Sequence, residues 1–133
     1  MKKKLFLMCI IGLMSVASAY AKCDGGTEIT IPSGTFCMGK NAMNWWTAAA
    51  WCQANGRHLA TMYEVCPSWN GQSGFQGCPG LSGSSDKYYA WTATAYNSGG
   101  AFSVRLSDGH VAADYSRNSD RTTHVYAFYP LCR

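Results

Sequence analysis

Residues 44–64 read NWWTAAAWCQANGRHLATMYE, and this stretch decides the fold that the sequence predicts. Asn44 is a suitable N-cap and Gly56 a suitable glycine to follow a helix C-terminus, so we expect one helix between them. Thr61 and Glu64 have the spacing of a capping box, which predicts that a second helix begins there. The stretch therefore predicts two helices joined by a short extended segment.

The first of these helices has one face suited to packing on a sheet. The residues at i, i+3, i+4 and i+7 on that face are Trp45, Ala48, Ala49 and Cys52. The small alanines allow a neighbouring sheet to approach closely. The second helix is expected to be short, because Pro67 follows Cys66 and cannot continue a helix.

Six segments have strand-like patterns, which makes the chain an α+β domain. The predicted strands span residues 27–31, 35–38, 88–94, 102–107, 111–115 and 124–128. Alternation in the fourth places Phe102, Val104 and Leu106 on a buried face. We expect Asp108-Gly109 to form a type I′ hairpin turn, and Pro130 to break the last strand.

The start of the chain has the pattern of an export signal. Three lysines precede an apolar run at residues 5–16, and small residues offer cleavage after Ala19 or after Ala21. We favour Ala21, which divides the chain into a signal peptide, residues 1–21, and one domain, residues 22–133. We expect no membrane span after the signal is removed, since no second apolar stretch follows. A retained N-terminal anchor is the alternative.

Removal of the signal changes the charge balance. Three of the eleven basic residues lie in it, so eight remain against seven acidic residues, and the net charge falls from +4 to +1. No basic run survives in the domain. We therefore expect no nucleic-acid partner.

The cysteine count favours an oxidising compartment. Cys9 lies in the signal, and the six others are Cys23, Cys37, Cys52, Cys66, Cys78 and Cys132. An even number in a small exported domain implies disulfides, but six cysteines allow 15 pairings, so their number alone does not choose among them. No Cys-x-x-Cys or zinc-type spacing occurs, and we expect no metal and no cofactor.

The second half of the chain, together with the two helices, resembles a known family. Residues 89–94 read YAWTAT, residues 101–111 read AFSVRLSDGHV, and the chain closes with Cys132-Arg133. This pattern is similar to bacterial secreted C-type-lectin-like domains, including the variable proteins of diversity-generating retroelements. The resemblance implies two helices packed on a two-part antiparallel sheet. It also implies the disulfides Cys23–Cys37, Cys52–Cys132 and Cys66–Cys78.

The same resemblance implies a binding function. We expect an exported domain in the periplasm, on the cell surface or outside the cell, which recognises a protein or glycan surface as a diversified, adhesin-like receptor. The contact surface is expected from residues 67–86, 96–98 and 114–126, which are rich in the side chains of recognition surfaces. The candidate ligand-binding residues are Trp69, Tyr96, Asn97, Arg105, Asp114, Tyr115, Arg117, Asn118, Asp120, His124 and Tyr126.

The five tryptophans are divided between core and surface. We expect Trp45, Trp51 and Trp91 to fill the core, where aromatic side chains bury large areas. Trp46 and Trp69 are expected to be exposed, and Trp69 to stack on a sugar ring or a partner surface.

Calcium and catalysis are not expected. Asp86 is the only carboxylate between Glu64 and Asp108, whereas calcium needs several oxygen ligands in that loop. His58 and His110 read as surface residues, and no nucleophile motif accompanies the serines, so we expect no catalytic residue. Two alternatives stay open: a structural subunit of a surface appendage, and a small envelope enzyme or inhibitor. The sequence does not predict the oligomeric state.

Overall fold

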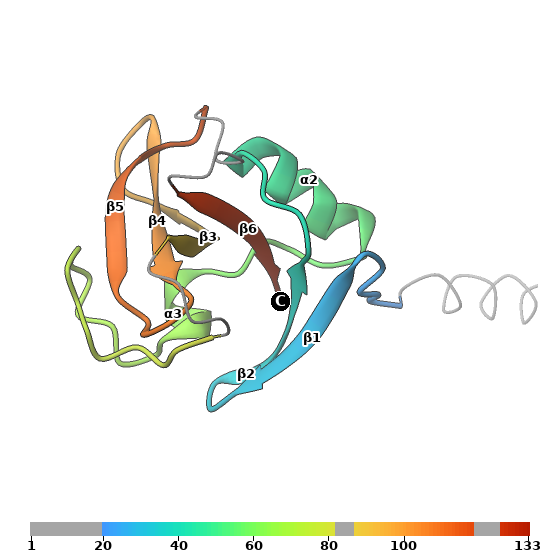
Figure 1. Cartoon of the computed structure of the whole chain (residues 1–133), viewed down its shortest axis with the longest axis horizontal. Helices are drawn as coiled ribbons and strands as arrows, with labels where there is room; N and C mark the ends of the chain where they lie inside the picture. Colours follow the sequence, from blue (N-terminus) through green and yellow to red (C-terminus); the bar gives the residue numbers. More distant parts are fainter. Residues whose placement is uncertain (1–19, 82–86, 119–125) are drawn as a thin grey trace, which may run out of the picture.

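The computed structural model describes residues 20–81, 87–118 and 126–133 (Figure 1). Within these residues the chain forms an α+β domain of two helices and six strands. The elements are β1 (Gly26–Ile31), β2 (Gly34–Gly39), α2 (Trp45–Ala54), α3 (Met62–Val65), β3 (Tyr88–Ala95), β4 (Gly100–Arg105), β5 (Val111–Ser116) and β6 (Ala127–Cys132). The described helices include none that is long and apolar enough to cross a membrane.

The sheet has the strand order β1-β2-β6-β3-β4-β5. Neighbouring strands are antiparallel except β3 and β6, which run parallel, with Tyr88 opposite Ala127 and Trp91 opposite Pro130. The expected two-part antiparallel sheet is therefore corrected at this pair, the one parallel pair among the described strands. The last strand returns to the middle of the sheet (Figure 1), where antiparallel pairing with β2 leaves it parallel to β3.

The prediction that Pro130 breaks the last strand is also wrong, because β6 continues through it to Cys132. Pairing between β2 and β6 is confined to Cys37 with Cys132 and Met38 with Leu131. Pro130 lies beyond these pairs, where its missing N–H removes no bond to β2. Its ring occupies the space beside Gly39, where a side chain would collide with it.

The two helices begin where the capping residues predict. The Asn44 side chain accepts a hydrogen bond from the Thr47 N–H at 2.8 Å, which confirms the N-cap of α2. Thr61 and Glu64 form both hydrogen bonds of the capping box at α3. Gly56 follows α2 with a φ of +68°, as expected of a terminating glycine.

The helices lie on opposite sides of β6, and each covers its own apolar core (Figure 1). The α3 side contains Val104 and Leu131, and the α2 side contains Cys52, Trp91 and Phe128. Burial of Trp91 confirms its predicted place in the core; Trp45 and Trp51 are only partly buried against it. Phe102, Val104 and Leu106 are buried as the alternation predicts.

The β4–β5 connection is a hairpin, but its turn is not of type I′. That type requires a positive φ at both central residues, and the described residues with positive φ are all glycines. In this turn only Gly109 has a positive φ, at +76°. Its N–H donates to the Arg105 carbonyl at 2.9 Å. A Cβ at position 109 would collide with the Cys78 carbonyl, so the glycine also lets the long loop approach β4.

The three disulfides implied by the family resemblance are all present. Cys52 on α2 is bonded to Cys132 on β6 across 80 residues of sequence, and Cys23 is bonded to Cys37 across 14. The Cys66–Cys78 disulfide, with a separation of 12, closes the loop after α3. Together they join the N-terminal hairpin, α2, the loop and the last strand.

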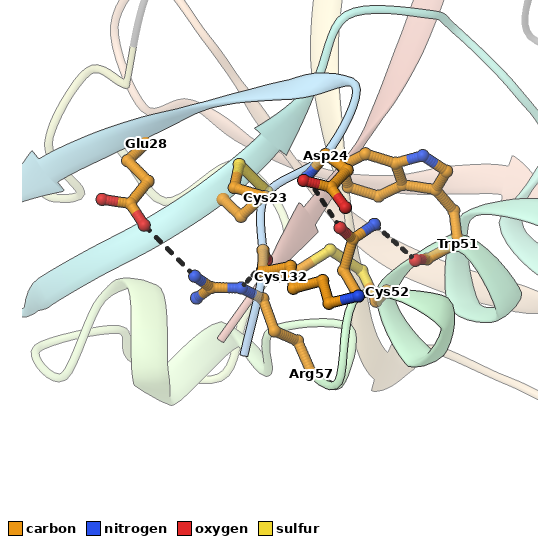
Figure 2. Close-up of a disulfide and its surroundings, with 10 residues drawn as sticks. Cys23, Asp24, Glu28, Trp51, Cys52, Arg57 and Cys132 are labelled. Atoms are coloured by element: carbon orange, nitrogen blue, oxygen red, sulfur yellow. Dashed lines mark hydrogen bonds and ion pairs between the residues drawn. A yellow bond between two sulfur atoms is a disulfide. The ribbon is translucent and has the colours of Figure 1, made fainter. Parts of the chain in front are cut away.

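The segment before β1 is tied to the end of α2 (Figure 2). The Lys22 N–H donates to the Asn55 carbonyl, and the Asp24 N–H donates to the Asn55 side chain, both at 2.8 Å. Arg57 donates to the Lys22 carbonyl at 2.6 Å and lies 3.4 Å from a carboxylate oxygen of Glu28. Residues near position 22 are therefore held beside the Cys52–Cys132 disulfide.

Candidate functional site

The first turn of α2 presents two adjacent tryptophans. Trp45 is partly buried, and its indole N–H donates to the Thr92 carbonyl at 2.8 Å. Trp46 is 54% exposed and meets the Trp45 ring edge-on, with centroids 4.8 Å apart. The sequence predicts the exposure of Trp46, and the structure confirms it.

Arg117, just beyond β5, extends over this tryptophan pair. Its guanidinium carbon lies 5.1 Å from the Trp45 ring centroid and 5.6 Å from that of Trp46, within cation–π range. The same guanidinium donates to the carbonyls of Asn97 and Ser98, at 3.2 and 2.8 Å. Its Nε–H is buried and has no hydrogen-bond partner among the described residues.

The β3–β4 turn is held in place by Asn97. The Asn97 side-chain oxygen accepts from the N–H groups of Gly99 and Gly100, at 3.0 and 2.7 Å. The backbone N–H of Arg117 donates to the Gly99 carbonyl at 2.8 Å, which joins the turn to the end of β5. Beside it Tyr96 is 51% exposed, with its ring packed on Phe102.

Asn118 completes the connection between these segments. Its side-chain oxygen accepts the indole N–H of Trp46 at 2.9 Å, across 72 residues of sequence. We call the surface formed by four residues of these three segments the Trp46–Arg117 face. Its members are Trp46, Asn97, Arg117 and Asn118.

Three predicted ligand-binding residues thus belong to one surface: Asn97, Arg117 and Asn118. The ring of Tyr96 instead packs on Phe102 of the α3-side core, whereas the Trp45 ring beneath Arg117 packs against the α2-side core. Trp46 completes the surface but was not among the predicted ligand contacts. The available signal was its place next to Trp45 in the first turn of a capped helix, where one of two adjacent side chains faces away from the core.

Trp69 is not a surface residue, so the expectation that it is exposed is wrong. It is 6% exposed, and its ring packs on Phe102 with centroids 4.6 Å apart. Its indole N–H donates to the Gln72 carbonyl at 2.9 Å. The loop after α3 is closed by the Cys66–Cys78 disulfide, and it carries Trp69 into the α3-side core.

Arg105 belongs to the opposite end of β4 from the Tyr96 turn. Its guanidinium forms two hydrogen bonds with the Asp108 carboxylate, at 2.9 and 2.6 Å. The hydrogen bond from Arg105 lowers the pKa of Asp108 to about 2, against a partial opposing effect of burial. This ion pair braces the β4–β5 loop, and Arg105 does not join the Trp46–Arg117 face.

Among the remaining predicted contacts, Tyr126 is the one whose side chain the structure describes. Tyr126 is half-buried against the α2-side core, with its ring 5.9 Å from that of Tyr89. Asp114 and Tyr115 lie on β5, and their side chains fall outside the description. Asp120 and His124 lie outside the described residues.

The described histidines have structural partners. His58 lies 2.9 Å from the Glu64 carboxylate, and His110 lies 2.9 Å from the Gln76 amide. Burial raises the pKa of Glu64, but hydrogen bonds from the Thr61 N–H and from His58 outweigh it, so the net pKa lies below the ordinary value. Within the described ranges, no three His, Cys, Asp or Glu side chains are grouped to hold a metal.

No protein-family model and no curated protein matches this chain.

Proposed function

We propose that this chain is an exported domain that recognises a protein or glycan surface through the Trp46–Arg117 face, without calcium. The observation that carries the proposal is the position of Arg117. Its guanidinium is fixed by two carbonyls against two indole rings, so little side-chain freedom remains to be lost on binding.

The composition of the face supports recognition of a surface. Tyrosine, tryptophan and arginine dominate the residues whose truncation most weakens protein interfaces, and asparagine supplies adaptable hydrogen bonds. The indole of Trp46 is about half exposed and offers apolar contact area. A preordered aromatic and polar surface of this kind suits a ligand larger than a single small molecule.

Two further features support the exported class and the lectin-like fold as parts of this proposal. Three disulfides persist best in an oxidising compartment. The bond from Cys52 on the first helix to Cys132 on the last strand is the one that the resemblance to C-type-lectin-like domains implies. The N-terminal hairpin carries the Cys23–Cys37 bond of the longer form of that family.

The proposal is tested with printed arrays of glycans and of extracellular protein domains. The wild-type domain is compared with Trp46→Ala and with Tyr63→Ala, an exposed aromatic on α3 that serves as the matched control. We expect Trp46→Ala to remove the strongest signals and Tyr63→Ala to retain them. Arrays on which Trp46→Ala binds as well as wild type, or on which wild type binds nothing, reject the proposal.

A further inference from the structure

A second concave surface lies away from the Trp46–Arg117 face. It is a cleft of about 290 Å³ between the β1–β2 hairpin and the parallel pair of β3 and β6. This volume is near the lower limit for small-molecule sites in proteins. No residue of the Trp46–Arg117 face lines it.

The floor of the cleft is apolar and firmly supported. Ile29, Met38 and Leu106 line it, and all three pack in or against the α3-side core. Two aromatic rings complete the walls: Tyr88 and Tyr129 meet almost perpendicularly, at 88°, with centroids 5.9 Å apart. Tyr88 is 41% exposed, so part of its ring remains open to a ligand.

The lining of the cleft also contains polar residues. Tyr88, Tyr129 and Thr27, each of which carries a hydroxyl group, are among the lining residues. Burial raises the pKa of Tyr129, and Tyr88 adds to the effect, so the Tyr129 hydroxyl is a neutral donor at pH 7. Three hydroxyls beside an apolar floor suit a ligand that carries both C–H faces and hydroxyl groups.

Lys40 gives the cleft a positive charge. It lines the cleft just after β2, and the ion pairs formed among the described residues do not involve its ammonium group. Among the described residues of the lining there is no carboxylate to neutralise it. The charge therefore favours a ligand with an anionic group.

We propose that this cleft binds a single carboxylate-bearing sugar ring of the hexuronic acid type. The C–H face of the ring packs on Tyr88 or Tyr129, its hydroxyls bond to the tyrosine and threonine hydroxyls, and its carboxylate pairs with Lys40. This site is independent of the Trp46–Arg117 face, so either proposal stands or falls without the other.

The probe for the test is D-glucuronate, titrated into the oxidised wild-type domain and followed by the NMR shifts of backbone amides. We expect shifts at positions 38–40, 88 and 129, with a dissociation constant on the order of 1 mM, as for a ligand of this size. D-glucose, which lacks the carboxylate, should bind about fivefold more weakly. Benzoate, which has a carboxylate but no sugar hydroxyls, should also bind more weakly than glucuronate.

Two variants with matched controls locate the binding. Lys40→Gln should weaken glucuronate binding about fivefold and Lys22→Gln should leave it unchanged. Tyr129→Phe should weaken it about threefold and Tyr63→Phe should not. The proposal is overturned if glucuronate shifts other amides or none, if benzoate binds as tightly, or if Lys40→Gln has no effect.

Discussion

At the scale of single residues, asparagine side chains replace backbone partners at several places in this domain. Asn44 caps α2, Asn97 closes the β3–β4 turn, and Asn55 ties the segment before β1 to the end of α2. Asn55 is 4% exposed, and its amide also donates to the Trp51 carbonyl at 3.1 Å. We therefore expect the Asn55 side chain to contribute to the free energy of unfolding.

We predict that Asn55→Ala lowers the free energy of unfolding by about 1–2 kcal/mol, because the Asp24 N–H then loses its partner in a partly buried position. Urea unfolding of the oxidised domain measures the change. Gln53→Ala on the exposed side of α2 is the control and should stay within about 0.5 kcal/mol of wild type. Equal stabilities for the two variants would show that the hydrogen bonds of the Asn55 side chain do not stabilise the domain.

Acid sensitivity is expected from Asp108. Its folded pKa of about 2 lies below the ordinary value of 3.8, so its ion pair with Arg105 stabilises the fold above about pH 4. This contribution is lost as the pH falls from there toward 2. The carboxylate is 43% exposed, and solvent screening limits the effect to about 1 kcal/mol.

The measurement is the unfolding free energy of wild type and of Asp108→Asn at pH 6 and at pH 2. We expect wild type to be the more stable at pH 6 and the difference to shrink at pH 2. A difference that is the same at both values would contradict the proposed linkage.

At the scale of elements, α3 shows how far local hydrogen bonds determine structure. It has only four residues, too few to be stable alone, yet it begins at the predicted capping box. Thr61 accepts the Glu64 N–H at 3.1 Å, and the Glu64 side chain accepts the Thr61 N–H at 2.9 Å. Met62 and Val65 then fix the helix to the α3-side core.

We predict that Thr61→Ala destabilises the domain by about 1 kcal/mol, because one of the two capping hydrogen bonds is lost. Thermal and urea unfolding measure the change. Thr47→Ala, an exposed position on α2, is the matched control and should alter stability by no more than about 0.5 kcal/mol. The capping account fails if Thr61→Ala is as stable as the control.

The contrast between α2 and β6 explains which elements the sequence predicts. The start and end of α2 depend on Asn44 and Gly56, which act on backbone groups within a few residues. The direction of β6 depends on which strands, far away in the sequence, it enters between. Local patterns contain no information on that choice, so neither the parallel pair nor the continuation through Pro130 was predicted.

At the scale of the whole molecule, the Trp46–Arg117 face depends on residues separated by 72 positions. The sequence predicts that Arg117 and Asn118 contact a ligand, but it does not show that Trp46 lies beside them. It also places Trp69 on the surface, because nothing local reveals that a disulfide-closed loop packs this ring on Phe102. Such contacts follow only from the arrangement of the sheet.

The Cys52–Cys132 disulfide is expected to contribute most to the stability of that arrangement. We predict that replacing both cysteines by alanine lowers the unfolding free energy by about 4.5 kcal/mol, since the bond closes 80 residues of chain. Replacing Cys66 and Cys78 should cost about 3 kcal/mol for a separation of 12. Urea unfolding compares the two pairs, and the reverse order would contradict this view of the fold.

The central claim is that the Trp46–Arg117 face is where this domain meets its ligand. Hydroxyl-radical footprinting tests it directly, by comparing the oxidation of Trp46 and Tyr63, which are 54% and 55% exposed, with and without the strongest ligand from the arrays. We predict that the ligand protects Trp46 and leaves Tyr63 unchanged. Oxidation of Trp46 at the same rate in the complex as in the free domain would contradict the claim.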